Sequence, residues 1–525
     1  MYDLILKNGT IIDGSGKEAF VGDIGIIDDK ICAIGELPIH DANKVIDIAG
    51  KIVCPGFIDM HSHSDLILLE KNTSDVKVRQ GVTTELLGQD GLGVAPVISD
   101  DGVDLVKNLV SSLAGEPSIE WKWTSFGSYL DALDRNGLPV NTAVLVTHGA
   151  VRIAVMGMEG RKATEEELIL MEEIIKQSIN EGAVGFSTGM VYPPCNYADK
   201  EELVRLTAAA KDTVFVIHMR DEGDEFIEAL GETMDICKQS GIKLHISHLK
   251  TYGPKNWHKM KDALKIITKA QENHQRITAD RYPYVAGCTF LAALLPTWTL
   301  AGGNKKLIER LKDYSQREII KADYTKSGWT NRPLSVGWEN IRIASMRTSN
   351  NKRFEGKSLS EIAISRGQDP ADTLCDILIE EDGGGTMIIF YGNEDVLSSV
   401  LIHPLVTIGS DGIYGGKPHP RLYGSFPRMI GHYVREKGLM PMEEAIRKMT
   451  SLPAEILRLD RRGMIKCGYY ADIVVFDFKE ISDQATFDNP MQYPTGINHV
   501  LVNGNIVVEN GSYNGSLSGR VLRSQ

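Results

Sequence analysis

The sequence lacks the features that mark several other classes of protein. No stretch approaches the ~20 consecutive apolar residues that a membrane-spanning helix needs, and the N-terminus lacks the basic and apolar segments of a secretory signal. The seven cysteines, from Cys32 to Cys467, have no CxxC spacing, so a structural zinc knuckle is not expected. Free or buried thiols fit a reducing compartment. We therefore expect a cytoplasmic protein.

An excess of positive charge is also lacking. Lys and Arg total 57 against 70 for Asp and Glu, which gives a net charge of -13. This charge repels phosphate backbones and anionic lipid surfaces, so nucleic acid and membranes are unlikely partners. We expect a small molecule as the partner, while the oligomeric state stays open. A negatively charged substrate would then need a local cationic pocket.

The two ends of the chain share one pattern. The 525 residues are 42% hydrophobic, enough for a large core and for two or three packed units. Residues 1–53 and 460–525 alternate apolar and polar side chains between turn signals such as Asn8-Gly9 and Asn503-Gly504. Alternation of this kind is typical of short antiparallel strands. We expect both ends to join one β-sandwich domain.

Residues 54–459 show a different sequence pattern. Apolar runs alternate with amphipathic helical segments such as 164–180 and 200–211, which predicts parallel strands joined by helices. Eight candidate strands end at Met60, Leu87, Thr147, Ser187, Met219, Leu249, Tyr282 and Gly409. The predicted fold class is therefore α/β, with a (β/α)₈ TIM-type barrel. Residues 386–391 form a surplus strand, and the interval at about 290–350, rich in Gly, Trp and charge, predicts an inserted subdomain.

Residues that can bind metal stand near several of these strand ends. His61 and His63 are two apart on a strand, so both side chains point to the same side and can converge on one ion. A single His-x-His is weak evidence, because many strands match it by chance. His218, His248 and Asp411, however, follow three other strands. The C-terminal strand ends of a barrel meet at one rim, so the five side chains predict a metal-dependent active site there.

Longer blocks of sequence carry a resemblance to a known family. They are Gly81-Val82-Thr83-Thr84, residues 182–192, Ile246-Ser247-His248-Leu249-Lys250, residues 281–287, Gly409-Ser410-Asp411-Gly412 and His419-Pro420-Arg421. With these blocks the sequence resembles the amidohydrolase superfamily and, within it, the D-aminoacylase (N-acyl-D-amino-acid deacylase) family, over residues 3–510. The resemblance implies an enzyme that hydrolyses the linear amide bond of N-acyl-D-amino acids to a D-amino acid and a carboxylate.

The resemblance also implies a ligand set for one or two zinc ions. His218 and His248 would hold the tighter ion, and a second position would be formed by His61, His63 and Asp411. Asp411 would also be the catalytic base. Asp90 occupies the position at which this family usually has a bridging cysteine. A carboxylate there makes Mn²⁺ and Co²⁺ possible as well as Zn²⁺.

A second set of positions would bind the substrate. By resemblance, Lys250, Tyr282 and Arg421 bind the α-carboxylate, with a point charge, a hydroxyl and a guanidinium fork. Cys288 stands in the same pocket where the family has a serine. Without the resemblance, Lys250 and Arg421 could equally be solvated charges at the rim.

Three other functions are alternatives to this deacylase: a cyclic-amide hydrolase, another amidase and a non-catalytic scaffold. A hydantoinase or dihydroorotase would need a carboxylated lysine at the fourth strand end, and residues 185–189 contain no lysine. A D-dipeptidase or another amidase would use the same residues and stays open. A non-catalytic scaffold is least expected, because such proteins lose their metal ligands. We expect His148 to be a structural histidine, whereas Glu222 either orients a ligand histidine or belongs to an ordinary loop.

Overall fold

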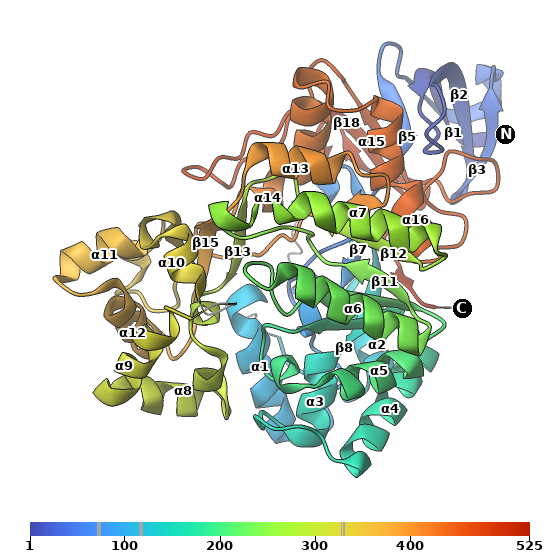
Figure 1. Ribbon diagram of the computed structural model, residues 1–525. Coiled ribbons are helices and arrows are strands. Elements are labelled where there is room, and N and C mark those ends of the chain that lie inside the picture. The colour runs from blue at the N-terminus through green and yellow to red at the C-terminus, as the bar shows by residue number, and fades with distance from the viewer. Residues whose placement is uncertain (71–74, 115–118, 327, 329–330, 525) are drawn as a thin grey trace.

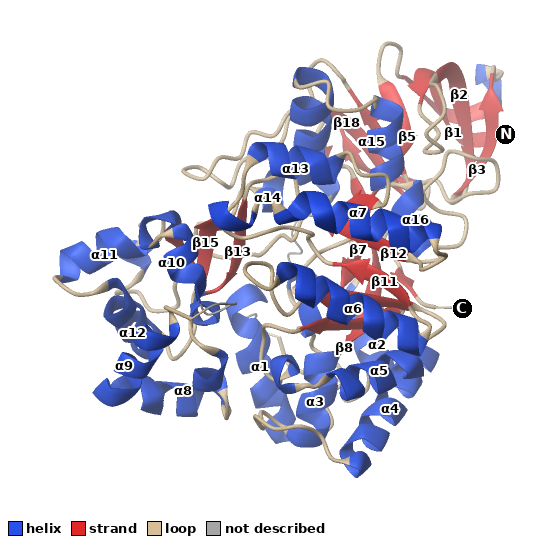
Figure 2. Cartoon of the chain, in the orientation of Figure 1, coloured by secondary structure: helices blue, strands red, loops and turns tan. Residues whose placement is uncertain are grey.

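The computed structural model describes residues 1–70, 75–114, 119–326, 328 and 331–524 (Figure 1). Its centre is a parallel sheet wrapped by helices, as Figure 2 shows. A second sheet built from both chain ends lies on one side of this centre, and a small subdomain containing α8 to α12 lies on the other. None of the helices in the described part of the chain combines the length and apolar sequence needed to span a bilayer.

Eight parallel strands, hydrogen-bonded in chain order, form the barrel. They are β6 (Phe57–Asp59), β7 (Val82–Leu87), β8 (Asn141–Thr147), β9 (Gly185–Gly189), β10 (Val214–His218), β11 (Lys243–Ile246), β12 (Ile277–Arg281) and β16 (Val406–Ile408). The barrel closes between β16 and β6. Next to these two strands, Met60 N donates to Ile408 O (3.4 Å) and Asp411 N donates to His61 O (2.8 Å). The predicted fold class is thereby confirmed, and each strand ends within three residues of its predicted end.

The helices around the barrel include several that begin at a capping residue of the sequence. They are α1 (Asp100–Ala114), α2 (Phe126–Asn136), α3 (His148–Met156), α4 (Glu165–Asn180), α5 (Lys200–Ala209), α6 (Phe226–Ser240), α7 (Lys259–Glu272), α13 (Glu394–Leu401), α14 (Arg421–Arg428), α15 (Met442–Met449) and α16 (Ser451–Ile456). Thr164 caps α4 in a capping box with Glu167, and the Asp199 side chain caps α5. The apolar faces of α2 to α7 pack on the barrel strands in one large core, while α14, α15 and α16 pack on them in two smaller cores.

The inserted subdomain contains a three-stranded antiparallel sheet and five helices. Its elements are β13 (Ala286–Phe290), α8 (Gly303–Lys312), α9 (Tyr314–Asp323), α10 (Arg332–Val336), β14 (Ile341–Ser345), α11 (Leu359–Arg366), α12 (Pro370–Glu380) and β15 (Thr386–Phe390). The surplus strand is therefore β15, which pairs with β13 and β14 and lies outside the barrel. The small sheet extends past the predicted interval of about 290–350 on both sides, because its first and last strands pair with each other. Its core includes Tyr252 and Tyr282 of the barrel, which joins the insertion to the barrel rim.

The chain ends share a nine-stranded sheet. It contains β1 (Tyr2–Ile11), β2 (Phe20–Ile27), β3 (Lys30–Gly35), β4 (Ala42–Asp47), β5 (Ile52–Pro55), β17 (Ile473–Phe476), β18 (Ile497–Val502), β19 (Asn505–Glu509) and β20 (Ser512–Tyr513). The pairing of β5 with β17 joins the two ends. Beyond this sheet, β21 (Val521–Leu522) pairs with β8 of the barrel, which the sequence did not reveal. The domain boundaries after residues 53 and 459 stay a prediction.

Candidate metal centre and substrate site

The predicted metal ligands lie together at the C-terminal rim of the barrel. His61 and His63 follow β6, His218 is the last residue of β10, and His248 follows β11. All four are buried, as are Asp411, which follows β16, and Asp90 in the 3₁₀ turn η4 (Gln89–Gly91) after β7. The six side chains form two groups that could hold a metal ion: His61, His63, Asp90 and Asp411, and Asp90, His218 and His248.

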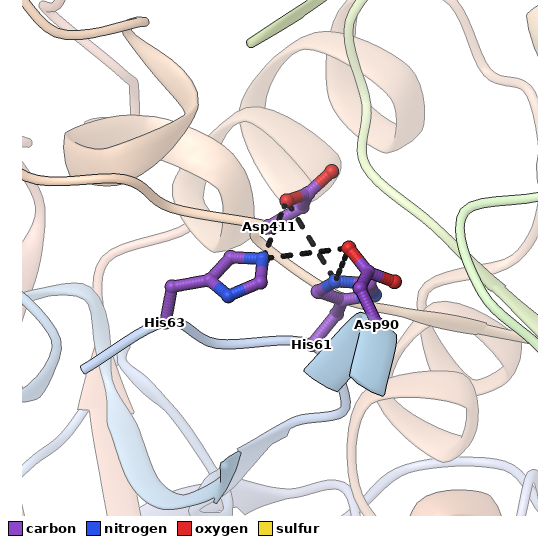
Figure 3. Close-up of side chains that lie close together, drawn as sticks. All are labelled: His61, His63, Asp90 and Asp411. Atoms are coloured by element: carbon purple, nitrogen blue, oxygen red, sulfur yellow. Dashed lines mark ion pairs between the residues drawn. The ribbon is translucent and has the colours of Figure 1, made fainter. Parts of the chain in front are cut away.

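The first group surrounds a space of the size of an ion (Figure 3). His63 Nε2 lies 3.3 Å from Asp411 Oδ1, and His61 Nε2 lies 3.7 Å from the same oxygen. Asp90 Oδ2 is 3.5 Å from His61 Nε2 and 3.7 Å from His63 Nε2. Two ligand atoms bound tetrahedrally to zinc at ~2.0–2.1 Å lie about 3.3 Å apart. The observed separations therefore fit a set of ligands that converge on one ion.

The second group uses the other oxygen of the same carboxylate. Asp90 Oδ1 lies 3.8 Å from His218 Nδ1 and 3.6 Å from His248 Nε2. Asp90 Oδ1 and His61 Nε2 are buried without a hydrogen-bond partner among the described residues. Leaving a buried polar atom unpaired costs about 1–3 kcal/mol, and a metal ion in each group would satisfy one of these two atoms. Because each oxygen of Asp90 faces one group, its carboxylate can bridge two ions.

The loop that carries Asp90 is held in an unusual conformation. Asp90 has φ 58°, in the left-handed region, and lies between Gly88 (φ 73°) and Gly91 (φ 70°). A side chain at Gly88 would collide with the carbonyl oxygen of Leu145. Ser187 Oγ donates to Gly88 O (2.5 Å) and accepts from Gly91 N (3.2 Å). Glycine and the Ser187 hydroxyl thus together aim the Asp90 side chain at the histidines.

His248 (φ 36°) and Asp411 (φ 49°) also adopt left-handed backbone conformations. Non-glycine residues are rare in this region, and such strain persists where the surrounding structure enforces it, which is common at functional sites. Three of the six candidate ligands therefore lie on strained backbone at one rim.

Each group has its own outer carboxylate. Glu222 Oε1 lies 3.2 Å from His248 Nδ1, and Glu222 Oε2 lies 3.6 Å from His218 Nε2. On the other side, Asp280 Oδ1 lies 3.5 Å from His61 Nδ1. A carboxylate that faces the second ring nitrogen of a ligand histidine orients the ring and raises its basicity. Sequence reasoning missed Asp280, although its place at the end of the seventh barrel strand was a signal.

Charge at the site keeps its carboxylates ionised. Burial would raise the pKa of Asp411, but Arg421 and His61 outweigh it and hold that pKa well below its usual range. Burial would also raise the pKa of Asp90, but the positive charges of His61 and His248 outweigh burial and hold this pKa well below its usual value. Arg421 Nη1 lies 2.9 Å from Asp411 Oδ2. Both carboxylates are therefore available as ligands or proton acceptors at neutral pH.

The predicted carboxylate-binding residues line the same cavity. Arg421 and Lys250 are 0% and 5% exposed, so neither is a solvated rim charge. Arg421 Nη2 donates to Cys288 O (3.0 Å), and its guanidinium lies over the Tyr282 ring at 4.4 Å. Lys250 Nζ lies 2.8 Å from His248 Nδ1 and contacts Glu222. Lys250 thus supports the second ligand group as well as facing the cavity.

The cavity also contains residues that sequence reasoning missed. Tyr192, Tyr252 and Arg332 line it together with the predicted residues. Arg332 comes from α10 of the insertion, and its guanidinium lies over the Tyr252 ring at 4.1 Å. No local pattern around Arg332 distinguishes it from other charged residues of the insertion. His148 does not line the cavity but is buried and hydrogen-bonded to Thr188 and Glu202, both at 2.8 Å, as expected for a structural histidine.

An apolar pocket of about 100 Å³ adjoins this cavity. The cavity and the pocket share Tyr192, whose ring centroid lies 5.1 Å from that of His218. The pocket is lined by α1, the loop after β9 and the insertion, including Leu105, Leu109, Val191 and Leu300, and its lining among the described residues contains no charged side chain. It can therefore accept an apolar group next to the metal ligands.

Comparison with known proteins matches nearly the whole chain. The amidohydrolase family model matches residues 44–290 and 388–508, and the unmatched interval falls in the insertion. A D-aminoacylase of Alcaligenes xylosoxydans xylosoxydans is 34% identical over 99% of this chain and 97% of its own. An N-acyl-D-glutamate deacylase of the same organism is 33% identical over 96% and 93%.

Solved structures extend this similarity to the fold. A crystal structure of a D-aminoacylase, described as defining a novel subset of amidohydrolases, has a TM-score of 0.82 at 34% identity, with all of both chains covered. The N-acyl-D-glutamate deacylase from Bordetella bronchiseptica, solved with zinc and a phosphonate that mimics the tetrahedral intermediate, has a TM-score of 0.83 at 32% identity, again with all of both chains covered. The L-hydantoinase from Arthrobacter aurescens, at 17% identity and a TM-score of 0.55 over all of both chains, shares the fold alone.

Proposed function

The chain belongs to the amidohydrolase family, and we propose that it is a metal-dependent deacylase that hydrolyses N-acyl-D-amino acids to a D-amino acid and a carboxylate. The observation that carries this proposal is the pair of ligand groups that share Asp90 beside a buried cationic clamp. The similarity over the whole chain to a D-aminoacylase and an N-acyl-D-glutamate deacylase supports the substrate class.

The residues present suit divalent metal ions. His218, His248 and Asp90 would hold one ion, and Asp90 with His61, His63 and Asp411 would hold the other. A divalent ion bound there polarises the amide carbonyl and lowers the pKa of water towards ~7. We propose zinc, because imidazole ligands suit it, while the carboxylate of Asp90 also accepts Mn²⁺ or Co²⁺.

Asp411 is the proposed base. Its ionised carboxylate would take the proton of the attacking water and pass it to the departing amine nitrogen, which must be protonated to leave. Arg421 pairs with one oxygen of Asp411. The Nε atom of Arg421 is buried and has no hydrogen-bond partner in the described part of the chain, so it can bind the substrate carboxylate. Tyr282 and Lys250 complete the clamp, and the neutral thiol of Cys288, whose pKa burial raises to about 12, lies beside it.

The apolar pocket at Tyr192 supports an apolar side chain on the amino acid. Burial of apolar surface contributes about 25 cal/mol per Å², whereas an ionised group would lose its hydration in a pocket whose described lining residues are all uncharged. We therefore propose leucine-like or aromatic D-amino acids in preference to acidic ones.

A screen of N-acetyl amino acids tests the function. The D-enantiomers of leucine and phenylalanine should be hydrolysed faster than that of glutamate, in keeping with the apolar pocket. The L-enantiomers should be strongly disfavoured, because metal, clamp and side-chain pocket together admit one enantiomer. Equal rates of hydrolysis for the two enantiomers, or activity only on cyclic ureides, would overturn the proposal. A D,D-dipeptide in the same screen tests the D-dipeptidase alternative. The cyclic-amide alternative is disfavoured because β9, the fourth barrel strand, contains no lysine.

We also propose the cytoplasm as the compartment, in keeping with seven free cysteines. Fractionation of the source cells, followed by the deacylase assay, tests this assignment.

A further inference from the structure

The opposite end of the barrel carries a cavity of about 880 Å³, here called the basal groove. It lies where α5, α6 and α7 end and where β11 and β12 begin. Six cationic side chains line it: Lys211, Lys238, Lys243, Lys269, Arg276 and Arg458. Among the described residues of the lining, Asp212 is the only acidic one. The groove is therefore strongly positive in a protein whose net charge is -13.

These cations are not held in ion pairs. Within the described part of the chain, none of the six forms an ion pair with a carboxylate, and Arg458 Nη1 donates instead to the carbonyl oxygen of Asp212 (2.8 Å). Burial lowers the pKa of Lys243, the charges of Arg458 and Arg276 lower it further, and Glu455 opposes this by raising it. The cations thus repel one another, and a bound anion would remove that repulsion.

Helix dipoles explain only part of the arrangement. Lys238 and Lys269 lie in the last turns of α6 and α7, where a cation offsets the partial negative charge of the helix end. Lys243 is the first residue of β11, and Arg276 directly precedes β12, so neither belongs to a helix. Helix dipoles therefore do not account for these two lining residues of the groove.

The groove suits a compact ligand. Its volume lies within the ~300–1,000 Å³ that small-molecule sites occupy. A long polyanion such as nucleic acid would also meet the negative charge of the remaining surface and be repelled. Arginine matches the paired oxygens of phosphate and carboxylate groups, and lysine adds point charges around them.

We propose that the basal groove binds a small polyanion with two or more phosphate or carboxylate groups. Lys243 and Arg276 are the central contacts. The site is separate from the metal centre, because Lys243 begins β11 and His248 follows the other end of that strand, so the length of the barrel strand lies between them. Its occupation therefore does not depend on the deacylase function, and the deacylase activity without the anion should not depend on Lys243 or Arg276.

Calorimetric titration of the metal-loaded protein with tripolyphosphate, and separately with citrate, tests the proposal. At least one probe should bind once per chain, and Lys243→Gln/Arg276→Gln should weaken that binding at least tenfold. The matched control Lys261→Gln/Lys265→Gln removes the same charge from exposed positions of α7 and should change binding less than twofold. Metal chelation by either probe would be equal in the two variants. Comparison of the probes distinguishes a phosphate source from a carboxylate source.

Absence of binding by both probes, or equal binding by the two double variants, would overturn the proposal. Footprinting of the wild-type protein gives an answer even if a variant fails to fold. Acetylation of Lys211, Lys238, Lys243 and Lys269 should slow several-fold when the probe is present, while Lys261 and Lys265 should react unchanged. Equal acetylation of all six lysines with and without the probe would also overturn the proposal.

Discussion

The two ligand groups at the metal centre share one carboxylate but are supported differently. His61 and His63 face Asp411, which is tied to the buried Arg421. His218 and His248 are backed by Glu222, which faces their outer ring nitrogens. Both groups have an outer carboxylate, Asp280 or Glu222, but only the first group contains Asp411, the proposed base. We infer that the first group contributes mainly to chemistry and the second mainly to metal retention.

Replacing the proposed base gives the largest expected effect. Asp411→Asn should lower kcat by ~10²–10⁴-fold, because an amide cannot accept the proton of water. The second group does not contain Asp411, so at least one metal ion per chain should remain bound. Steady-state kinetics together with metal analysis separates the two effects. A variant that keeps most of its kcat would place the base elsewhere.

Removing the shared carboxylate should affect both groups. Asp90→Ala should lower bound metal and reduce activity by more than about 100-fold, beyond the ~10–100-fold typical of outer partners of a metal site. Asp90→Cys should keep zinc and part of the activity, because a thiolate is also a good zinc ligand. Metal content and kcat measured on both variants provide the test. Full metal content and normal turnover in Asp90→Ala would make Asp90 a turn residue only.

The outer carboxylates allow the two groups to be weakened separately. Glu222→Gln should weaken the ion held by His218 and His248, and Asp280→Asn should weaken the ion held by His61, each by ~10–100-fold in affinity. Competition with a coloured chelator measures the two affinities. If both variants lose the same ion, the two groups are not independent.

The smallest expected effect concerns the loop that aims Asp90. Ser187→Ala removes two hydrogen bonds from this loop and should cost about 1–3 kcal/mol of unfolding free energy, with a partial loss of bound metal. Ser178→Ala, which removes a buried hydroxyl bonded within α4, is the matched control. It should lower stability without lowering metal content. Equal metal loss in the two variants would show that the Ser187 contacts do not position Asp90.

Much of the fold was readable from local pattern. Strands buried on both faces leave near-continuous apolar runs, and helices leave caps such as Thr164 and Asp199. Strand ends of a barrel converge, so histidines at separate strand ends predict one site before any contact is known. The insertion was harder to delimit, because β13 and β15 pair across about a hundred intervening residues, and local pattern carries no information on such a pairing.

The sequence by itself determined the residue types at the rim, the order of the strands and the resemblance of the whole chain to one family. Only the tertiary structure decided that each oxygen of Asp90 faces a different ligand group, that Asp280 and Glu222 back different histidines, and that Arg332 reaches the cavity from the insertion. It also decided that cations from four helix ends and two strand starts gather in the basal groove. The physical reason is that periodicity and capping act between neighbours in the chain, whereas ligand geometry and local charge depend on side chains that only folding brings together.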